Sequence, residues 1–73
     1  MDEIPVRLPI KLGQFVKLAS LAESGGEARE LIEAGDVYVN DVQETRRGHT
    51  LSDGDVVTVV TPAGEDSVRV VEG

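Results

Sequence analysis

The chain has 73 residues, which is enough for one small domain that buries only about 60% of its unfolded surface on folding. It contains no cysteine and a single histidine, which excludes disulfides, thiolate metal sites and the common histidine zinc motifs. Fourteen acidic and seven basic residues give a formal net charge of −7, which for the molecule as a whole disfavours a polyanionic partner.

The charges are segregated along the chain. Residues 7–29 carry a net charge of +2 and residues 42–51 a net charge of +1, whereas the remaining segments are all acidic. If the two basic segments meet in the fold, they form a basic face on an acidic body. Such a face suits a phosphate backbone, while the acidic remainder keeps the protein soluble.

The N-terminal third predicts an edge strand and a helix. Residues 4–8 alternate apolar and polar side chains, and Pro5 is tolerated at a sheet edge. From Lys11 to about Ala22, apolar residues recur at the spacing of an amphipathic helix. Lys11 and Lys17 lie on its polar side, where they either face solvent or contact a ligand.

A second helix is expected from about Gly25 to Ala34. Ser24 and Glu27 have capping-box spacing, in which the glutamate side chain reaches back to the serine N–H. Gly25 and Gly26 leave the helix start free of side chains, so it is either an ordinary cap or a site for a phosphate oxygen.

The outer side and the C-terminal end of this helix each contain an informative residue. Arg29 lies on the outer side, and an i,i+4 pair with Glu33 is too weak to occupy it fully. Gly35 is expected to end the helix as a C′ residue. The short link between the two helices predicts a helical hairpin with a common apolar side.

The second half of the chain predicts β-structure. Asn40 and Asp41 accept the positive φ values of a two-residue turn, so residues 36–45 read as a β-hairpin. Residues 56–61 and 67–71 predict a second hairpin. We therefore expect an α+β fold, with the helical hairpin packed on a small antiparallel sheet of four or five strands.

The loop after the first hairpin contains the chain's one dibasic pair, Arg46 and Arg47. Gly48, which follows, either allows a ligand to approach the backbone closely or serves as a turn residue. His49 fits a surface residue, a phosphate contact or a mild pH sensor equally well.

No catalytic motif is found, and neither a P-loop nor a strand-borne GxGxxG is present. We therefore expect no enzymatic activity, no cofactor and no metal. Phe15 and Tyr38, the two aromatic residues, are too few for a base-stacking platform. The N-terminus lacks the features of a signal peptide and no long apolar run is present, so we expect a cytoplasmic protein without a membrane partner.

Four segments of the sequence carry a combined motif, namely Ser24–Arg29, Gly35–Asn40, Arg46–Gly48 and Leu51–Val56. Taken together, they resemble the RNA-binding domain named after small-subunit ribosomal protein S-four, and especially its short stand-alone bacterial members. The resemblance covers about residues 10–60 of a single domain spanning 1–73. It implies the αL motif, a helical hairpin followed by a β-hairpin loop, and binding of structured RNA such as ribosomal or transfer RNA, with the ribosome as a candidate host.

By position, the resemblance implies RNA contacts in the two basic segments. The residues are Lys11, Lys17, Ser24, Gly25, Gly26, Arg29, Arg46, Arg47 and His49. The sequence departs from the family in three respects, each of which lowers the expected affinity. Asp41 replaces a usual glycine, His49 and Thr50 stand where lysine or arginine is usual, and the whole chain is strongly acidic.

The leading hypothesis is a monomeric, non-catalytic RNA-binding protein. If three or four phosphates are neutralised, the log–log salt slope of binding should be roughly −2 to −4. The alternative, motivated by the net charge, is a protein-interaction module that kept the fold but has weak RNA affinity. Co-purified RNA, seen as nuclease-sensitive absorbance, would distinguish the two. A third hypothesis, a small carrier activated at Gly73, fits the order of helices and hairpin poorly.

Overall fold

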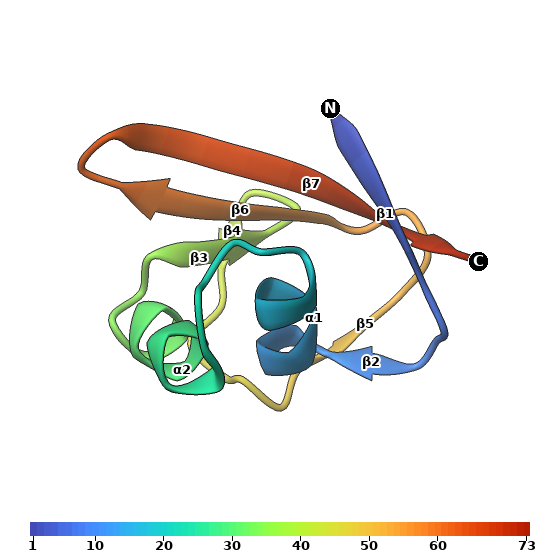
Figure 1. The fold of residues 1–73 in the computed structure, drawn as a ribbon, viewed down its shortest axis with the longest axis horizontal. Coiled ribbons are helices and arrows are strands. Elements are labelled where there is room, and N and C mark those ends of the chain that lie inside the picture. The colour runs from blue at the N-terminus through green and yellow to red at the C-terminus, as the bar shows by residue number, and fades with distance from the viewer.

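The computed structural model describes all residues, 1–73, and has its two helices on one side of a β-sheet (Figure 1). This confirms the predicted α+β class. The elements in chain order are β1 (Asp2–Val6), β2 (Ile10–Lys11), α1 (Leu12–Leu18), α2 (Gly25–Glu33), β3 (Val37–Val39), β4 (Val42–Gln43), β5 (Thr50–Leu51), β6 (Val56–Thr61) and β7 (Gly64–Glu72).

The main sheet has five strands in the order β1-β7-β6-β3-β4. The pairs β3–β4 and β6–β7 are antiparallel, as expected for hairpins, and β3 also pairs antiparallel with β6, which joins the two hairpins into one sheet. The edge strand β1 instead runs parallel to β7, with Asp2 opposite Val68, so the sheet is mixed rather than wholly antiparallel. The two strands lie at opposite ends of the chain, so no short turn forces them to run in opposite directions.

A second, two-stranded sheet was not predicted. It pairs β2 with β5, placing Ile10 opposite Leu51 and Lys11 opposite Thr50. Strands of two residues are too short to show the alternation by which strands are recognised in a sequence. This small sheet connects the start of α1 with the segment that follows the dibasic loop.

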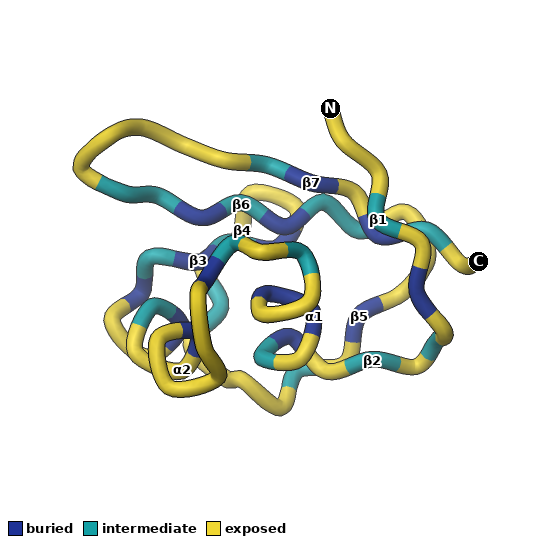
Figure 2. The backbone as a smooth tube through the Cα atoms, in the orientation of Figure 1, coloured by how far each residue is buried: buried dark blue, intermediate teal, exposed yellow.

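The core lies between the helices and the inner face of the sheet, and Figure 2 shows buried positions alternating with more exposed ones along β6 and β7. Phe15 is the largest fully buried side chain. The apolar side of α1 is buried at Leu12, Phe15 and Val16. In α2, where Ala28, Leu31 and Ile32 are the residues expected to face inward, Ala28 and Ile32 are buried and Leu31 is partly buried. Fourteen apolar residues form this cluster, and no polar or charged residue is buried.

Two predicted turns are confirmed, whereas some strand ends differ, because β1 covers Asp2–Val6 rather than residues 4–8 and β7 covers Gly64–Glu72 rather than residues 67–71. Gly35 has φ +84°, and the N–H groups of Gly35 and Asp36 donate to the carbonyls of Ile32 and Leu31, which ends α2 as predicted. Asn40 and Asp41 both have positive φ, as a two-residue hairpin turn requires.

Helix α1 is shorter than predicted. It ends at Leu18, about four residues early, because Ser20 adopts φ +60° and turns the chain out of the helix. Neither helix is long and apolar enough to cross a membrane.

Candidate nucleic-acid interface

The segment between β4 and β5, residues 44–49, is held against the start of α1, and we call it the basic loop. The Leu12 N–H donates to the carbonyl oxygen of His49 at 2.8 Å, and the Gly13 N–H donates to that of Arg47 at 3.0 Å. These bonds use amides of the first helical turn that have no partner within the helix. A Cβ at Gly13 would lie 3.3 Å from the Arg47 Cβ, so glycine permits this close approach.

This packing brings the two basic segments of the sequence together around a surface hollow of about 370 Å³. We call it the basic hollow. It is lined by residues from α1, the start of α2 and the basic loop, together with the residue that precedes α1, and none of them is hydrophobic or acidic. They are Lys11, Gly13, Gln14, Lys17, Gly25, Arg29, Arg47 and Gly48. Four cationic side chains therefore meet at one place on a chain whose net charge is −7.

The four cations of the hollow differ in how they are engaged. The Lys11 Nζ donates to the Thr50 Oγ1 at 2.9 Å, a neutral partner that leaves the lysine charge unbalanced. The Arg29 Nε pairs with Glu33 at 3.1 Å, and both side chains are more than half exposed. Such a pair is typically worth only ~0.2–0.5 kcal/mol, so a phosphate can displace it. Lys17 and Arg47 form no ion pair.

The start of α2 forms one wall of the hollow. The Ser24 Oγ accepts the Glu27 N–H at 3.1 Å, as predicted. The returning bond differs from the prediction, because the Glu27 carboxylate accepts the N–H of Glu23 at 3.3 Å instead of that of Ser24. Ser24 is extended, with φ −150° and ψ 166°, and the carboxylate reaches past it to the preceding amide.

Gly25 has no structural requirement for glycine within the protein. A Cβ built at this position meets no atom within 4 Å, and its φ lies outside the left-handed region. Gly48, which also lines the hollow, has the same two properties. Glycines that neither packing nor backbone geometry requires leave room for a ligand to approach the main chain.

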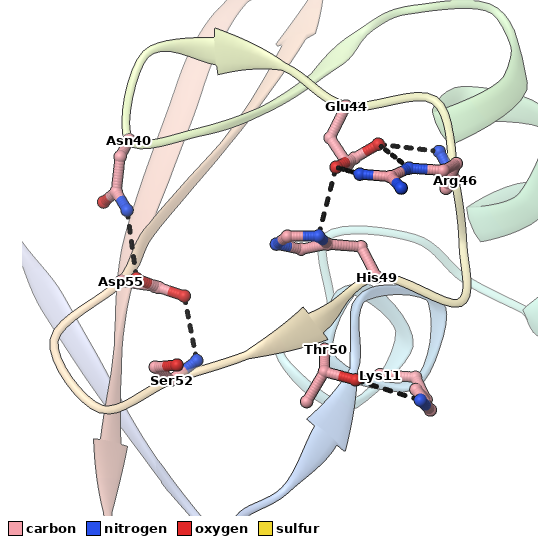
Figure 3. A network of polar contacts seen from close by, with 8 residues as sticks. All are labelled: Lys11, Asn40, Glu44, Arg46, His49, Thr50, Ser52 and Asp55. Atoms are coloured by element: carbon pink, nitrogen blue, oxygen red, sulfur yellow. Dashed lines mark hydrogen bonds and ion pairs between the residues drawn. The ribbon is translucent and has the colours of Figure 1, made fainter.

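On its other side, the basic loop is organised around Glu44. The Glu44 carboxylate accepts three hydrogen bonds from Arg46, from the backbone N–H at 3.1 Å and from Nε and Nη2 at 3.0 Å each. The Nδ1 of His49 lies 3.1 Å from the same carboxylate, and Figure 3 shows both side chains turned toward it. These bonds from Arg46 lower the pKa of Glu44 from 4.5 to about 2, and Glu44 raises the pKa of Arg46.

The structure thus separates the residues that the sequence had grouped. Lys11, Lys17, Gly25, Arg29 and Arg47 line the basic hollow, and Ser24 and Gly26 flank Gly25. Arg46 and His49 do not line it, and their side chains contact Glu44 instead.

Sequence reasoning missed two lining residues and the role of a third. Gln14 accepts the N–H of Lys11 at 3.2 Å and so closes the start of α1 beside the hollow. Gly13 was visible as a glycine inside an amphipathic helix pattern, an anomaly that often has a packing reason. Glu44 belongs to no recognisable sequence motif.

No group of three or more histidine, cysteine, aspartate or glutamate side chains is placed to hold a metal ion.

Comparison with known proteins gives two matches. The profile of a family described as the S4 domain matches residues 6–71, nearly the whole chain. A protein of Bacillus subtilis (strain 168) named "Probable ribosome maturation protein RlbA" is 48% identical over 50 residues. That alignment covers 68% of this chain and 70% of the Bacillus protein.

Proposed function

The chain belongs to the S4 domain family, and we propose that it is a non-catalytic protein that binds structured RNA through phosphate and shape contacts. The observation that carries this proposal is the basic hollow, where Lys11, Lys17, Arg29 and Arg47 converge without an acidic neighbour in the lining. A concave cluster of one sign of charge focuses the local field and attracts a polyanion even on an acidic molecule.

The aromatic residues support contact with phosphates and shape rather than with stacked bases. Phe15 is fully buried in the core, and Tyr38 is half-buried on β3. Single-strand binders that read bases use exposed aromatic platforms, whereas double-stranded and structured RNA is recognised largely through backbone and shape. The hollow therefore suits a folded RNA that places its phosphates at fixed positions.

The Bacillus relative, whose name links it to ribosome maturation, favours ribosomal RNA over transfer RNA as the ligand. A maturing ribosomal particle, met in the cytoplasm by a monomer of this chain, is the setting that we propose. The alternative of a protein-interaction module with weak RNA affinity rests on the net charge of −7. The acids of the chain lie outside the lining of the hollow, so the ligand there meets a local charge of the opposite sign.

The proposal is tested by measuring the affinity for labelled ribosomal RNA fragments as a function of salt, using fluorescence anisotropy. If all four cations neutralise phosphates, the log–log slope should be about −3 to −4. A slope near zero, together with purified protein that carries no nuclease-sensitive RNA, would favour the interaction module instead.

Two adjacent arginines provide a matched comparison within the basic loop. Arg47→Ala removes a cation of the hollow and should make the slope shallower by about 0.7–0.9. Arg46→Ala makes the same chemical change one residue earlier, at a side chain that does not line the hollow, and should leave the slope unchanged. Equal effects of the two substitutions would refute the assignment of the hollow as the RNA site.

A further inference from the structure

Arg46 and Arg47 are neighbours in the sequence, yet only Arg47 lines the basic hollow. The Arg46 side chain is 75% exposed, so burial does not prevent it from meeting a ligand. Arg46 differs from Arg47 in its contact with Glu44, whose side chain is only 13% exposed. The Glu44 carboxylate accepts hydrogen bonds from both the backbone N–H and the guanidinium of Arg46. Figure 3 shows the guanidinium directed at this carboxylate.

We propose that Glu44 is a specificity-determining residue, which withholds Arg46 from anionic ligands and so confines phosphate binding to the four cations of the basic hollow. This inference rests on the proposed function. Two-pronged guanidinium–carboxylate contacts fix both orientation and distance, and the third bond to the Arg46 N–H anchors the carboxylate to the loop. A phosphate that binds Arg46 must displace the Glu44 carboxylate. Because one anion then replaces another, the phosphate gains little binding free energy.

Withholding this arginine matters for selectivity because phosphate contacts carry no sequence information. A fifth, exposed and mobile cation would attract any polyanion. The four cations of the hollow come from β2, α1, α2 and the basic loop, which hold them at fixed positions. They therefore favour an RNA whose phosphates match their spacing. Glu44 therefore lowers the affinity for unstructured polyanions more than the affinity for a fitting RNA.

The loop backbone is also held by hydrogen bonds that do not involve the Glu44 side chain. The carbonyls of His49 and Arg47 are held by the amides of Leu12 and Gly13 in α1. Glu44→Gln should consequently leave the loop seated against α1 while it frees the Arg46 guanidinium. Unchanged amide resonances of Leu12 and Gly13 in ¹H–¹⁵N spectra would verify that the loop stays in place.

The direct test follows the arginine Nε resonances while heparin, an unstructured polyanion, is titrated into the protein. In the wild type, Arg47 Nε should shift and Arg46 Nε should not, whereas in Glu44→Gln both should shift. Glu30→Gln is the matched control, because it removes the same charge from an exposed α2 residue that forms no ion pair. In this control, the Arg46 Nε resonance should not shift when heparin is added.

The same variants give an RNA readout that a merely structural role of Glu44 would not produce. Glu44→Gln should steepen the salt slope by about 0.7–0.9 and raise the affinity for poly(U) more than for structured RNA. In an Arg46→Ala background, Glu44→Gln should have no such effect. The inference would be overturned if heparin shifted the Arg46 Nε resonance as strongly in the wild type as in Glu44→Gln. It would also be overturned if this resonance shifted in neither protein.

The RNA-binding function and the role of Glu44 are tested by different measurements. If the wild-type protein bound no structured RNA, the proposed function would be refuted. The heparin titration would still show whether Glu44 keeps Arg46 from binding anions.

Discussion

Gly25→Ala is expected to stabilise the protein and to weaken RNA binding at the same time. The added Cβ meets no atom within 4 Å and φ lies outside the left-handed region, so alanine fits the native backbone. Reduced freedom of the unfolded chain should then raise the free energy of unfolding by about 0.4–1 kcal/mol. For a 73-residue domain this corresponds to an increase in Tm of roughly 3–6 °C.

Binding should change in the opposite direction, because the methyl group projects where a phosphate would approach the α2 amides. Losing one hydrogen bond to a charged ligand typically costs about 1.5 kcal/mol, which is roughly a tenfold rise in Kd. Thermal unfolding by circular dichroism and RNA affinity by anisotropy measure the two effects. The opposed signs distinguish a binding position from a structural one.

Gly54→Ala is the control for this experiment. It also meets no atom within 4 Å, but Gly54 has φ +89°, where an alanine is strained. It should lower stability by about 1–2 kcal/mol and leave the RNA affinity of the folded protein unchanged. A Gly25→Ala protein that binds RNA as tightly as the wild type would refute the placement of Gly25 at the interface.

Three further substitutions test the loop and the core. The lowered pKa of Glu44 means that its pairing with Arg46 stabilises the fold fully above pH 4.5 and less as the pH falls toward 2. Urea unfolding of the wild type and Glu44→Gln should therefore differ at about pH 6 and converge near pH 2, and a pH-independent difference would contradict this. Gly13→Ala should crowd the Arg47 Cβ at 3.3 Å, destabilise the fold by about 1 kcal/mol and weaken RNA binding; unchanged binding would argue against this contact. Phe15→Ala should cost about 3–5 kcal/mol in urea unfolding, because the side chain is fully buried, and a loss below about 1 kcal/mol would contradict its central place in the core.

Much of the fold could be predicted because local rules and tertiary structure agree. The inward residues of both helices follow the 3.6-residue period, and Gly35 ends α2 through its positive φ. The parallel pairing of β1 with β7 and the two-residue sheet of β2 with β5 could not be predicted. Both join segments that are far apart in the chain, and neither leaves a turn motif or a long alternating pattern in the sequence.

The same limit applies to the site. Segregated charge indicated a basic face, and the fold does bring those segments together through the contacts of Leu12 and Gly13 with the basic loop. Local pattern could not tell Arg46 from Arg47, because the difference arises from a carboxylate two residues before Arg46. A carboxylate at that spacing is common in loops, and only the loop conformation determines which arginine it binds.

The location of the acids explains how a chain of net charge −7 can present a site for a polyanion. Glu44 neutralises Arg46 in place, Glu33 forms only a weak pair with Arg29, and no carboxylate lines the basic hollow itself. At physiological ionic strength, charges more than about 8 Å apart are largely screened. In the proposed complex, distant acids therefore act mainly on the long-range approach of an RNA, while its bound phosphates contact Lys11, Lys17 and Arg47 directly. The proposal therefore implies that, in a domain of this size, the position of each acid relative to the hollow determines RNA affinity more than the net charge does.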